Sequence, residues 1–175
     1  MSHDVPGRAK AVSLLGSLVF FAIAPGTIAG LVPYLLTDWR VQSSTPHLPA
    51  IRIVGAVVLL AGVALLVDCF LRFALEGRGT PAPVAPTEQL VLSGTYRHVR
   101  NPIYIAVVSI IVGQAFLFGS ATLIAYAALV WIAFHLFVRL YEEPALRRRF
   151  GRGYDEYVRH VPRWLPRASA WDARP

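Results

Sequence analysis

The sequence predicts an all-α integral membrane protein with about four transmembrane helices, and three observations support this prediction. Hydrophobic residues make up 55% of the 175 residues and the mean hydropathy is +0.53, which is too apolar for an ordinary soluble domain. Uncharged or nearly uncharged runs of membrane-spanning length recur along the chain. Basic residues gather on one side of the predicted spans, as the positive-inside rule requires.

The first predicted span lies within residues 11–36, which contain no charged side chain. This run is longer than the apolar core of a typical signal peptide, and no convincing cleavage site closes it, so we expect a membrane helix rather than a signal peptide. Pro25 and Gly26 near its middle predict a kink. The polar connector that follows, residues 37–50, carries Trp39, a residue type typical of the membrane interface.

The second predicted span, residues 51–75, carries charged residues near its end. Asp68, Arg72 and Glu76 follow one another at intervals of four and therefore share one helical face. They form either a salt-bridge ladder or one wall of a polar cavity, and the two interpretations are compatible. Residues 77–93 contain two glycines and three prolines, so they leave the helix and form either a linker or a lid over a cytosolic site.

The third and fourth predicted spans form a tight antiparallel hairpin. Pro102 suits the first turn of a helix, and residues 103–118 would extend it for about 24 Å at 1.5 Å per residue. Gly119 and Ser120 interrupt the apolar pattern before a helix predicted over residues 121–140. So short a break leaves room only for a sharp reversal of the chain.

Short cytosolic helices are predicted after the hairpin. Pro144 starts a basic helix over residues 145–150, and a further short helix carries Tyr154 and Tyr157. Residues 169–175 are expected to form a frayed tail.

The distribution of basic residues predicts the topology. With four spans, fifteen of the 17 lysines and arginines fall on one face and only Arg40 and Arg52 on the other. Both termini and the candidate site are therefore expected in the cytosol, in the inner membrane if the protein is bacterial. We divide the chain into residues 1–50, an N-terminal helix and connector, and residues 51–175, a membrane-embedded core with a basic tail.

A polar stretch at the start of the hairpin, residues 94–104 (GTYRHVRNPIY), marks the candidate site. It places arginines, a histidine, an asparagine and tyrosines at the mouth of an apolar run, where polar groups without partners are costly to bury. The predicted hairpin returns Glu142 and Glu143 to the same membrane face. We therefore expect the polar stretch and the two glutamates to form one site.

The residue types exclude several kinds of chemistry. The single cysteine, Cys69, allows no intramolecular disulfide and has no obvious histidine partner for thiol catalysis. His98 alone cannot build a zinc site, and the chain has neither a G-x-S-x-G nucleophile motif nor a P-loop. An anionic inner leaflet explains the net charge of +7 more simply than nucleic acid does. Arginines, carboxylates and aromatic rings suit a small zwitterionic ligand such as S-adenosylmethionine, without singling it out.

Four motifs, in their order and spacing, resemble the isoprenylcysteine carboxyl methyltransferase family and, more broadly, the phospholipid methyltransferase-like membrane enzymes. They are GTPAP at residues 79–83, the stretch 94–104, the glutamate pair, and FGRGYDEY at 150–157 followed by VPRW at 161–164. The resemblance covers about residues 72–166. It implies S-adenosylmethionine bound at the cytosolic face and a lipophilic acceptor that enters from the bilayer among membrane lipids.

The resemblance also implies roles for individual residues. The family's Arg-(His/Asn)-Pro-x-Tyr element, glutamate pair and Phe-Gly-x-x-Tyr element map onto this chain. With the neighbouring polar residues they give the expected cofactor-binding set: Tyr96, Arg97, His98, Arg100, Asn101, Pro102, Tyr104, Glu142 and Tyr154. Glu143 and Arg139 would lie nearest the acceptor as catalytic residues. Arg139 would orient a carboxylate, or Glu143 would accept a proton from an amine or thiol. No metal is expected.

Two positions depart from the family pattern. Asn101 stands where the eukaryotic enzymes have histidine, which suggests a bacterial-type member, and Ala106 stands where many members have glycine, which suggests a less close approach to the cofactor. A purely structural interpretation also exists, in which Arg139 pairs with a neighbouring glutamate and Glu143 pairs with Arg147 as helical ion pairs. In the same interpretation Trp164 anchors the tail at the membrane interface.

The function expected from the sequence is methyl transfer from S-adenosylmethionine to a small lipophilic acceptor, by in-line displacement aided by positioning and exclusion of water. The acceptor would be an isoprenoid or prenylcysteine-like carboxylate, or a lipid amine or thiol. Two alternatives remain at this point: a membrane reductase that uses a nicotinamide cofactor, and a non-catalytic membrane protein whose basic tail recruits a partner or anionic lipid. The glutamate pair opposite Arg100 argues against the latter.

Overall fold

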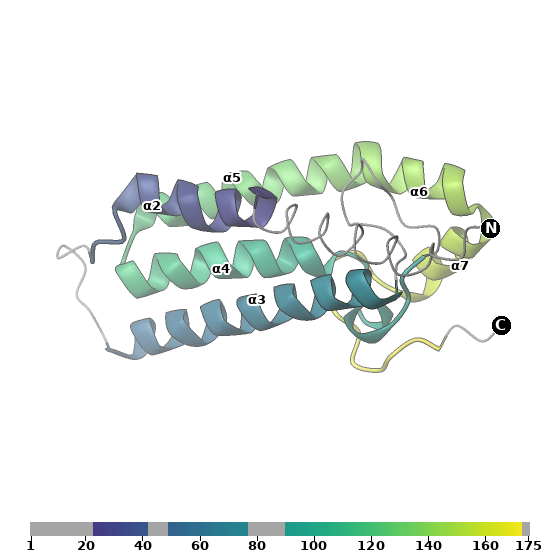
Figure 1. Ribbon diagram of the computed structural model, residues 1–175, viewed down its shortest axis with the longest axis horizontal. Helices are drawn as coiled ribbons and strands as arrows, with labels where there is room; N and C mark the ends of the chain where they lie inside the picture. The colour runs from purple at the N-terminus through teal and green to yellow at the C-terminus, as the bar shows by residue number, and fades with distance from the viewer. Residues whose placement is uncertain (1–22, 42–48, 77–89, 173–175) are drawn as a thin grey trace, which may run out of the picture.

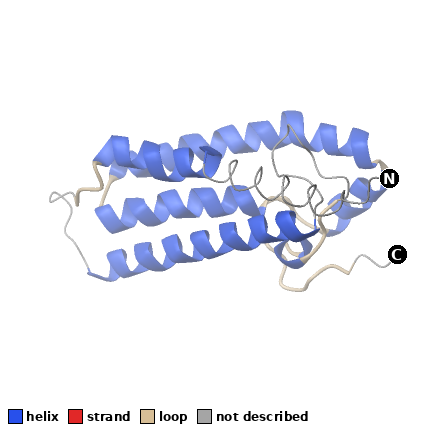
Figure 2. Cartoon of the chain, viewed as in Figure 1, coloured by secondary structure: helices blue, strands red, loops and turns tan. Residues whose placement is uncertain are grey.

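The computed structural model describes residues 23–41, 49–76 and 90–172, and every regular element within these ranges is helical (Figures 1 and 2). The all-α class predicted from the sequence is confirmed for this part of the chain. In chain order the elements are η1 (Thr27–Leu31), α2 (Val32–Thr37), α3 (Pro49–Glu76), η2 (Gly94–Arg97), α4 (Pro102–Phe118), α5 (Ala121–Phe137), η3 (Val138–Glu142), α6 (Glu143–Phe150) and α7 (Arg152–His160). The predicted lid or linker, residues 77–93, lies outside the described residues except for its last four.

Four apolar segments lie alongside one another in a bundle (Figure 1). Two of them, Pro49–Arg72 and Ala121–Phe150, are long and apolar enough to cross a membrane. The other two, Ile23–Thr37 and Pro102–Phe118, are apolar but shorter. Within the described ranges, therefore, two of the four predicted spans have the length and composition of a transmembrane helix.

Helices α3 and α4 pack closely because small residues face one another between them. A Cβ added to Gly113 would lie 2.6 Å from the backbone nitrogen of Leu59, and one added to Gly62 would lie 3.0 Å from the carbonyl oxygen of Ala106. Small residues allow membrane helices to approach in this way. Ala106 is fully buried at this contact, which gives it a packing role against α3.

The hairpin between α4 and α5 agrees with the prediction. Gly119 has a φ of 67°, the left-handed conformation that ends many helices and that glycine adopts without strain. Ser120 then caps α5, because its Oγ accepts a hydrogen bond from the backbone nitrogen of Leu123 at 3.3 Å.

The end of the hairpin differs from the prediction. A helix was expected to stop at residue 140 and a separate one to begin after Pro144, but α5, η3 and α6 form one continuous helix (Figure 1). The π-turn η3 ends two residues before Pro144. Proline lacks the amide that a regular helix uses and clashes with the carbonyl four residues earlier, and a wider turn accommodates this.

A second π-turn has the same relation to a proline. η1 ends two residues before Pro33, and it begins directly after Pro25 and Gly26, where the sequence predicted an irregularity. Two carbonyls of this turn are taken by side chains from other helices: the amide nitrogen of Gln114 donates to Ala29 O at 2.7 Å, and the hydroxyl of Tyr126 donates to Ile28 O at 3.0 Å. Neighbouring helices thus satisfy backbone groups next to a proline, as a low-dielectric surrounding demands.

Candidate functional site

The glutamate pair lies at the junction of η3 and α6, and the π-turn sets its orientation. Glu142 follows Phe134 by eight positions, which in a regular α-helix would place them about 80° apart around the axis. A π-turn absorbs one extra residue and brings the two side chains back to nearly the same face. The contacts agree, because Tyr104 meets both: its ring centroid lies 4.7 Å from that of Phe134, and its hydroxyl donates to Glu142 Oε2 at 2.7 Å.

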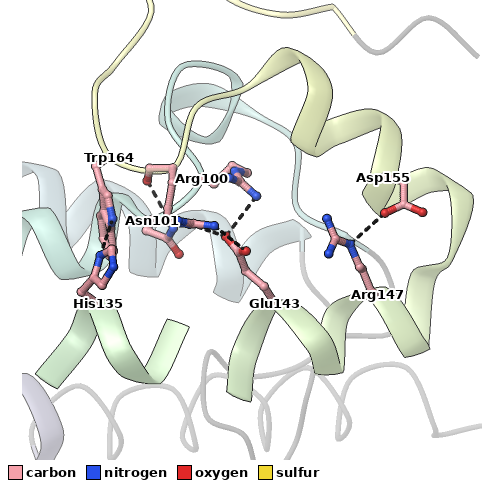
Figure 3. Close-up of polar contacts among 8 residues, drawn as sticks. Arg100, Asn101, His135, Glu143, Arg147, Asp155 and Trp164 are labelled. Atoms are coloured by element: carbon pink, nitrogen blue, oxygen red, sulfur yellow. Dashed lines mark hydrogen bonds and ion pairs between the residues drawn. The ribbon is translucent and has the colours of Figure 1, made fainter. Parts of the chain in front are cut away.

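Glu143 is the centre of a buried charge cluster (Figure 3). Glu143 is buried, with 7% of its surface exposed. Arg163 donates from Nε to Oε1 at 2.6 Å and from Nη2 to Oε2 at 2.8 Å, and Arg100 Nη1 lies 3.1 Å from Oε1. Two guanidinium groups therefore neutralise one carboxylate, and the cluster carries a net positive charge.

Arg163 belongs to a segment that we call the C-terminal strap, residues 161–172. The strap runs along residues 97–101 and is held by backbone bonds: Arg100 N donates to Pro162 O, Arg167 N to His98 O and Trp171 N to Arg97 O, each at 3.0 Å. The prediction of a frayed tail is therefore wrong as far as residue 172. The aromatic rings of the strap and of α7 explain the order, since Trp171 stacks on His160 with ring centroids 5.3 Å apart.

Three of the predicted cofactor-binding residues hold this strap. Arg97 donates from Nε to the carbonyl of Trp171 and forms an ion pair with Asp172. The Nδ1 atom of His98 bonds to the carbonyl of Arg167 at 2.8 Å, and the amide of Asn101 donates to the carbonyl of Arg163 at 3.2 Å. These side chains position the segment that carries Arg163.

Within the described part of the chain, three further predicted residues, Pro102, Tyr96 and Arg139, form no hydrogen bond or ion pair with the two glutamates. Pro102 is buried at the first turn of α4 and fixes the start of the helix that carries Tyr104. Tyr96 packs against Cys69 and Val91. Arg139 is exposed and forms no ion pair with a described carboxylate, so its expected pairing with the glutamates is wrong.

The helical pairing expected between Glu143 and Arg147 is also absent from the structure. Arg147 instead donates to Asp155 of α7 at 2.9 Å. On α3, by contrast, the predicted pair of Asp68 and Arg72 is present at 2.9 Å, and Thr95 of η2 donates to the same carboxylate. The side chain of Glu76 lies outside the described residues.

Tyr154 and Arg163 keep their protonation states in this surrounding. Desolvation, together with the negative charge of Glu143, raises the pKa of Tyr154 to about 12, so its phenol is neutral. The hydrogen bond to Glu143 raises the pKa of Arg163, so its guanidinium stays charged. Tyr154 is buried in a cluster with Tyr157 and Val161, which joins α7 to the strap.

Tyr104 also lies next to a group of aromatic side chains. The ring of Trp164 lies 4.5 Å from that of Trp131 and 6.5 Å from that of Tyr104, measured between centroids. Its Nε1 donates to Nδ1 of His135 at 3.2 Å (Figure 3). The aromatic group thus connects α4, α5 and the strap beside the two glutamates.

Two residues of the site were not predicted from the sequence. Arg163 belongs to the VPRW motif at residues 161–164, but its pairing with Glu143, twenty positions earlier, follows from no regular helical spacing. His135 is an ionisable residue inside an apolar helix, which by itself is a signal of function. Among the described residues no group of three or more histidines, cysteines, aspartates or glutamates could hold a metal ion.

Comparisons with known proteins agree with the motifs. The family model described as phospholipid methyltransferase matches residues 50–153, more than half of the chain. Protein-S-isoprenylcysteine O-methyltransferase B of Arabidopsis thaliana is 38% identical over 79 residues, which are 45% of this chain and 40% of that protein. No solved structure matches the chain. The match to the family model, which includes α3, α4, α5 and the glutamate pair, shows that this chain belongs to the phospholipid methyltransferase family.

Proposed function

We propose that the protein is an integral membrane methyltransferase that uses S-adenosylmethionine and methylates the carboxylate of a lipophilic small molecule. One observation carries the proposal: the polar stretch before α4 and the glutamate pair after α5 meet at one end of an apolar bundle. Tyr104 contacts Glu142, and Arg100 contacts Glu143. Such a cluster of polar groups at the end of membrane helices is typical of a ligand site.

The residues present fit the cofactor. Arg100 Nε is buried and makes no hydrogen bond to the described part of the chain, so a donor is left for a ligand carboxylate. Glu142 can accept from an ammonium group or a ribose diol, and the rings of Tyr104 and Trp164 can face a sulfonium. When bound, S-adenosylmethionine supplies an electrophilic methyl group on a positively charged sulfur.

The state of the nearby bases favours a carboxylate acceptor. Glu143 is held by two arginines, Glu142 accepts from Tyr104, and the Nδ1 atom of His135 accepts from Trp164. An amine or thiol would have to lose a proton to a base, whereas a carboxylate is already ionised. Glu143 then positions Arg100 and Arg163 and takes no proton, and the exposed Arg139 has no part in the chemistry.

The proposed topology places both termini and the site in the cytosol, with four helices in the membrane and, in a bacterium, in the inner membrane. Large apolar side chains on the outer faces of α3 and α5 support this, since Leu60, Leu71 and Leu129 are 65%, 54% and 65% exposed. Lipid tails would cover them. The positive-inside distribution of arginines supports the orientation.

The test is calorimetric binding of S-adenosylmethionine and S-adenosylhomocysteine to the full chain in lipid nanodiscs. We expect micromolar binding by the wild type and a loss of at least tenfold in Glu142→Gln, which keeps the shape of the side chain but removes its charge. Glu156→Gln, on the exposed surface of α7, is the matched control and should bind as the wild type does. Absence of binding to folded wild-type protein would contradict the proposal.

A further inference from the structure

His135 lies within the apolar helix α5 beside Trp164, and the proposed function gives its Nε2 atom no role. An ionisable side chain at such a position is rare unless it contacts a partner or a ligand. Glu143 follows His135 by eight positions and the π-turn lies between them, so the two side chains lie on nearly the same face of the continuous helix. Figure 3 shows His135 and Trp164 together, beside Asn101 and the ion pairs of Glu143.

The contact with Trp164 fixes the tautomer of His135. An indole nitrogen only donates, so Nδ1 of His135 must accept, at 3.2 Å. The imidazole is then neutral and carries its proton on Nε2. That Nε2–H makes no hydrogen bond to any residue that the structure describes, and the side chain is partly exposed.

The surroundings of this donor are apolar and aromatic. Trp131 and Trp164 lie 4.5 Å apart between ring centroids, and the neighbouring Ile132 and Leu136 are 55% and 48% exposed on the outer face of α5. A neutral donor costs less to hold at the edge of a bilayer than a cation does. It can bind an oxygen of a ligand, but it offers nothing to an ammonium group, which has no lone pair.

We propose that the Nε2–H of His135 binds an oxygen of the acceptor's head group, while Trp131 and Trp164 cover the first part of its apolar chain. The ligand class is that of the proposed function, a lipophilic molecule with a carboxylate head group next to an apolar chain. This inference rests on the proposed function and adds the residues that select and position the acceptor. Trp164 fixes the tautomer of His135 and so its Nε2–H donor. The residue before it, Arg163, donates to Glu143, so one short segment connects His135 to the glutamate pair.

The test measures equilibrium binding of two probes to the full chain in nanodiscs with S-adenosylhomocysteine present. N-acetyl-S-farnesylcysteine carries the carboxylate, and farnesyl methyl thioether keeps the hydrocarbon chain without it. His135→Leu removes the donor, and His135→Gln keeps one acceptor and one donor. We expect His135→Leu to weaken binding of the carboxylate probe about tenfold and leave the thioether unchanged, and His135→Gln to restore most of the loss.

A purely structural role would give a different pattern. If His135 only anchors the strap, Trp164→Phe and His135→Leu would weaken both probes alike and lower the affinity for S-adenosylhomocysteine as well. That result would overturn the inference, as would equal binding of the carboxylate probe by wild type and His135→Leu, or no saturable binding by the wild type. Binding of S-adenosylhomocysteine reports separately on the proposed function, so the two failures can be told apart.

Discussion

Arg163 donates from Nε and Nη2 to the two carboxylate oxygens of Glu143, at 2.6 and 2.8 Å. This bidentate contact joins the C-terminal strap to the helix that carries the glutamate pair. A buried carboxylate is costly unless it is paired and hydrogen-bonded, and Arg100 shares the task from the start of α4. The end of the chain is therefore part of the site.

The first prediction concerns this contact. Arg163→Ala should lower the free energy of unfolding in detergent by about 2–3 kcal/mol, because hydrogen bonds to a charged group contribute ~1.5–3 kcal/mol and Arg100 still neutralises Glu143. Arg167→Ala is the matched control: it also removes an arginine from the strap, but among the described residues its side chain hydrogen-bonds to the exposed His160 and Ser169 and not to Glu143. It should cost less than about 0.5 kcal/mol.

A double-mutant cycle completes this test. Glu143→Gln alone leaves two guanidinium groups without a counter-charge, so it should also be destabilising. Combined with Arg163→Ala it should cost clearly less than the sum of the single changes, by about 1 kcal/mol or more. Strict additivity would contradict a direct energetic coupling between the two residues.

The second prediction concerns Tyr104 and Glu142. Tyr104→Phe removes the hydroxyl that donates to Glu142 at 2.7 Å and keeps the ring against Phe134 and Trp164. Without that donor the carboxylate is less well oriented, so we expect about tenfold weaker binding of S-adenosylmethionine by calorimetry, which corresponds to ~1.4 kcal/mol. Because the lost bond is to a carboxylate, the free energy of unfolding should also fall, by about 1.5–3 kcal/mol.

Tyr126→Phe is the matched control for this change. It removes a hydroxyl that donates to Ile28 O at 3.0 Å, far from the glutamates. It should leave cofactor affinity within twofold of the wild type. Equal effects of the two variants would mean that hydroxyl loss acts through general stability and that Tyr104 does not orient Glu142.

The third prediction uses the π-turn η3 (Val138–Glu142). Because a π-turn holds one extra residue, deletion of the exposed Leu140 should convert it into a regular helix and keep Glu142 on the face of Phe134. Insertion of an alanine after Leu140 should instead rotate Glu142 by about 100° away from Tyr104. Both variants should be folded by circular dichroism. We expect the deletion to bind S-adenosylmethionine within about fivefold of the wild type and the insertion to bind none.

The opposite ranking, with the deletion inactive and the insertion active, would contradict this account of the turn. Equal loss in both variants would also contradict it, since a regular helix would then be unable to replace η3. Leu140 is 71% exposed, so its deletion removes little packing.

The sequence predicted the hairpin and the meeting of its two polar ends because both follow from local rules. Two interrupting residues, Gly119 and Ser120, force a reversal, and the lengths of the helices then bring Glu142 back to the level of Tyr104. Glycine and serine also have the backbone and capping preferences that such a turn requires. Nothing beyond neighbouring residues was needed.

The contacts of the strap could not be predicted in this way. Arg97 and His98 look like ligand-binding residues because they are polar and close to the membrane, yet they bond to residues about seventy positions later. A π-turn has no composition of its own, so Pro144 was interpreted as the start of a helix, although the helix continues through it. Long-range pairing and turn width depend on the whole fold, which local patterns do not contain.

The last prediction tests the packing that holds α4, and with it Tyr104, against α3. A Cβ on Gly113 would meet two backbone atoms, Leu59 N at 2.6 Å and Gly55 O at 2.8 Å, so the helices would have to move apart. Gly113→Ala should therefore lower the free energy of unfolding by about 1–3 kcal/mol, the usual cost of overpacking.

Gly30→Ala is the matched control for this packing change, because a Cβ there meets nothing within 4 Å. It should be neutral or stabilise by up to about 1 kcal/mol, since alanine loses less backbone entropy than glycine in a helix. Both variants are compared by denaturant titration in one detergent. If Gly113→Ala were as stable as Gly30→Ala, α3 and α4 would not approach as closely in solution as the structure shows, and the position of Tyr104 would have to depend on the strap alone.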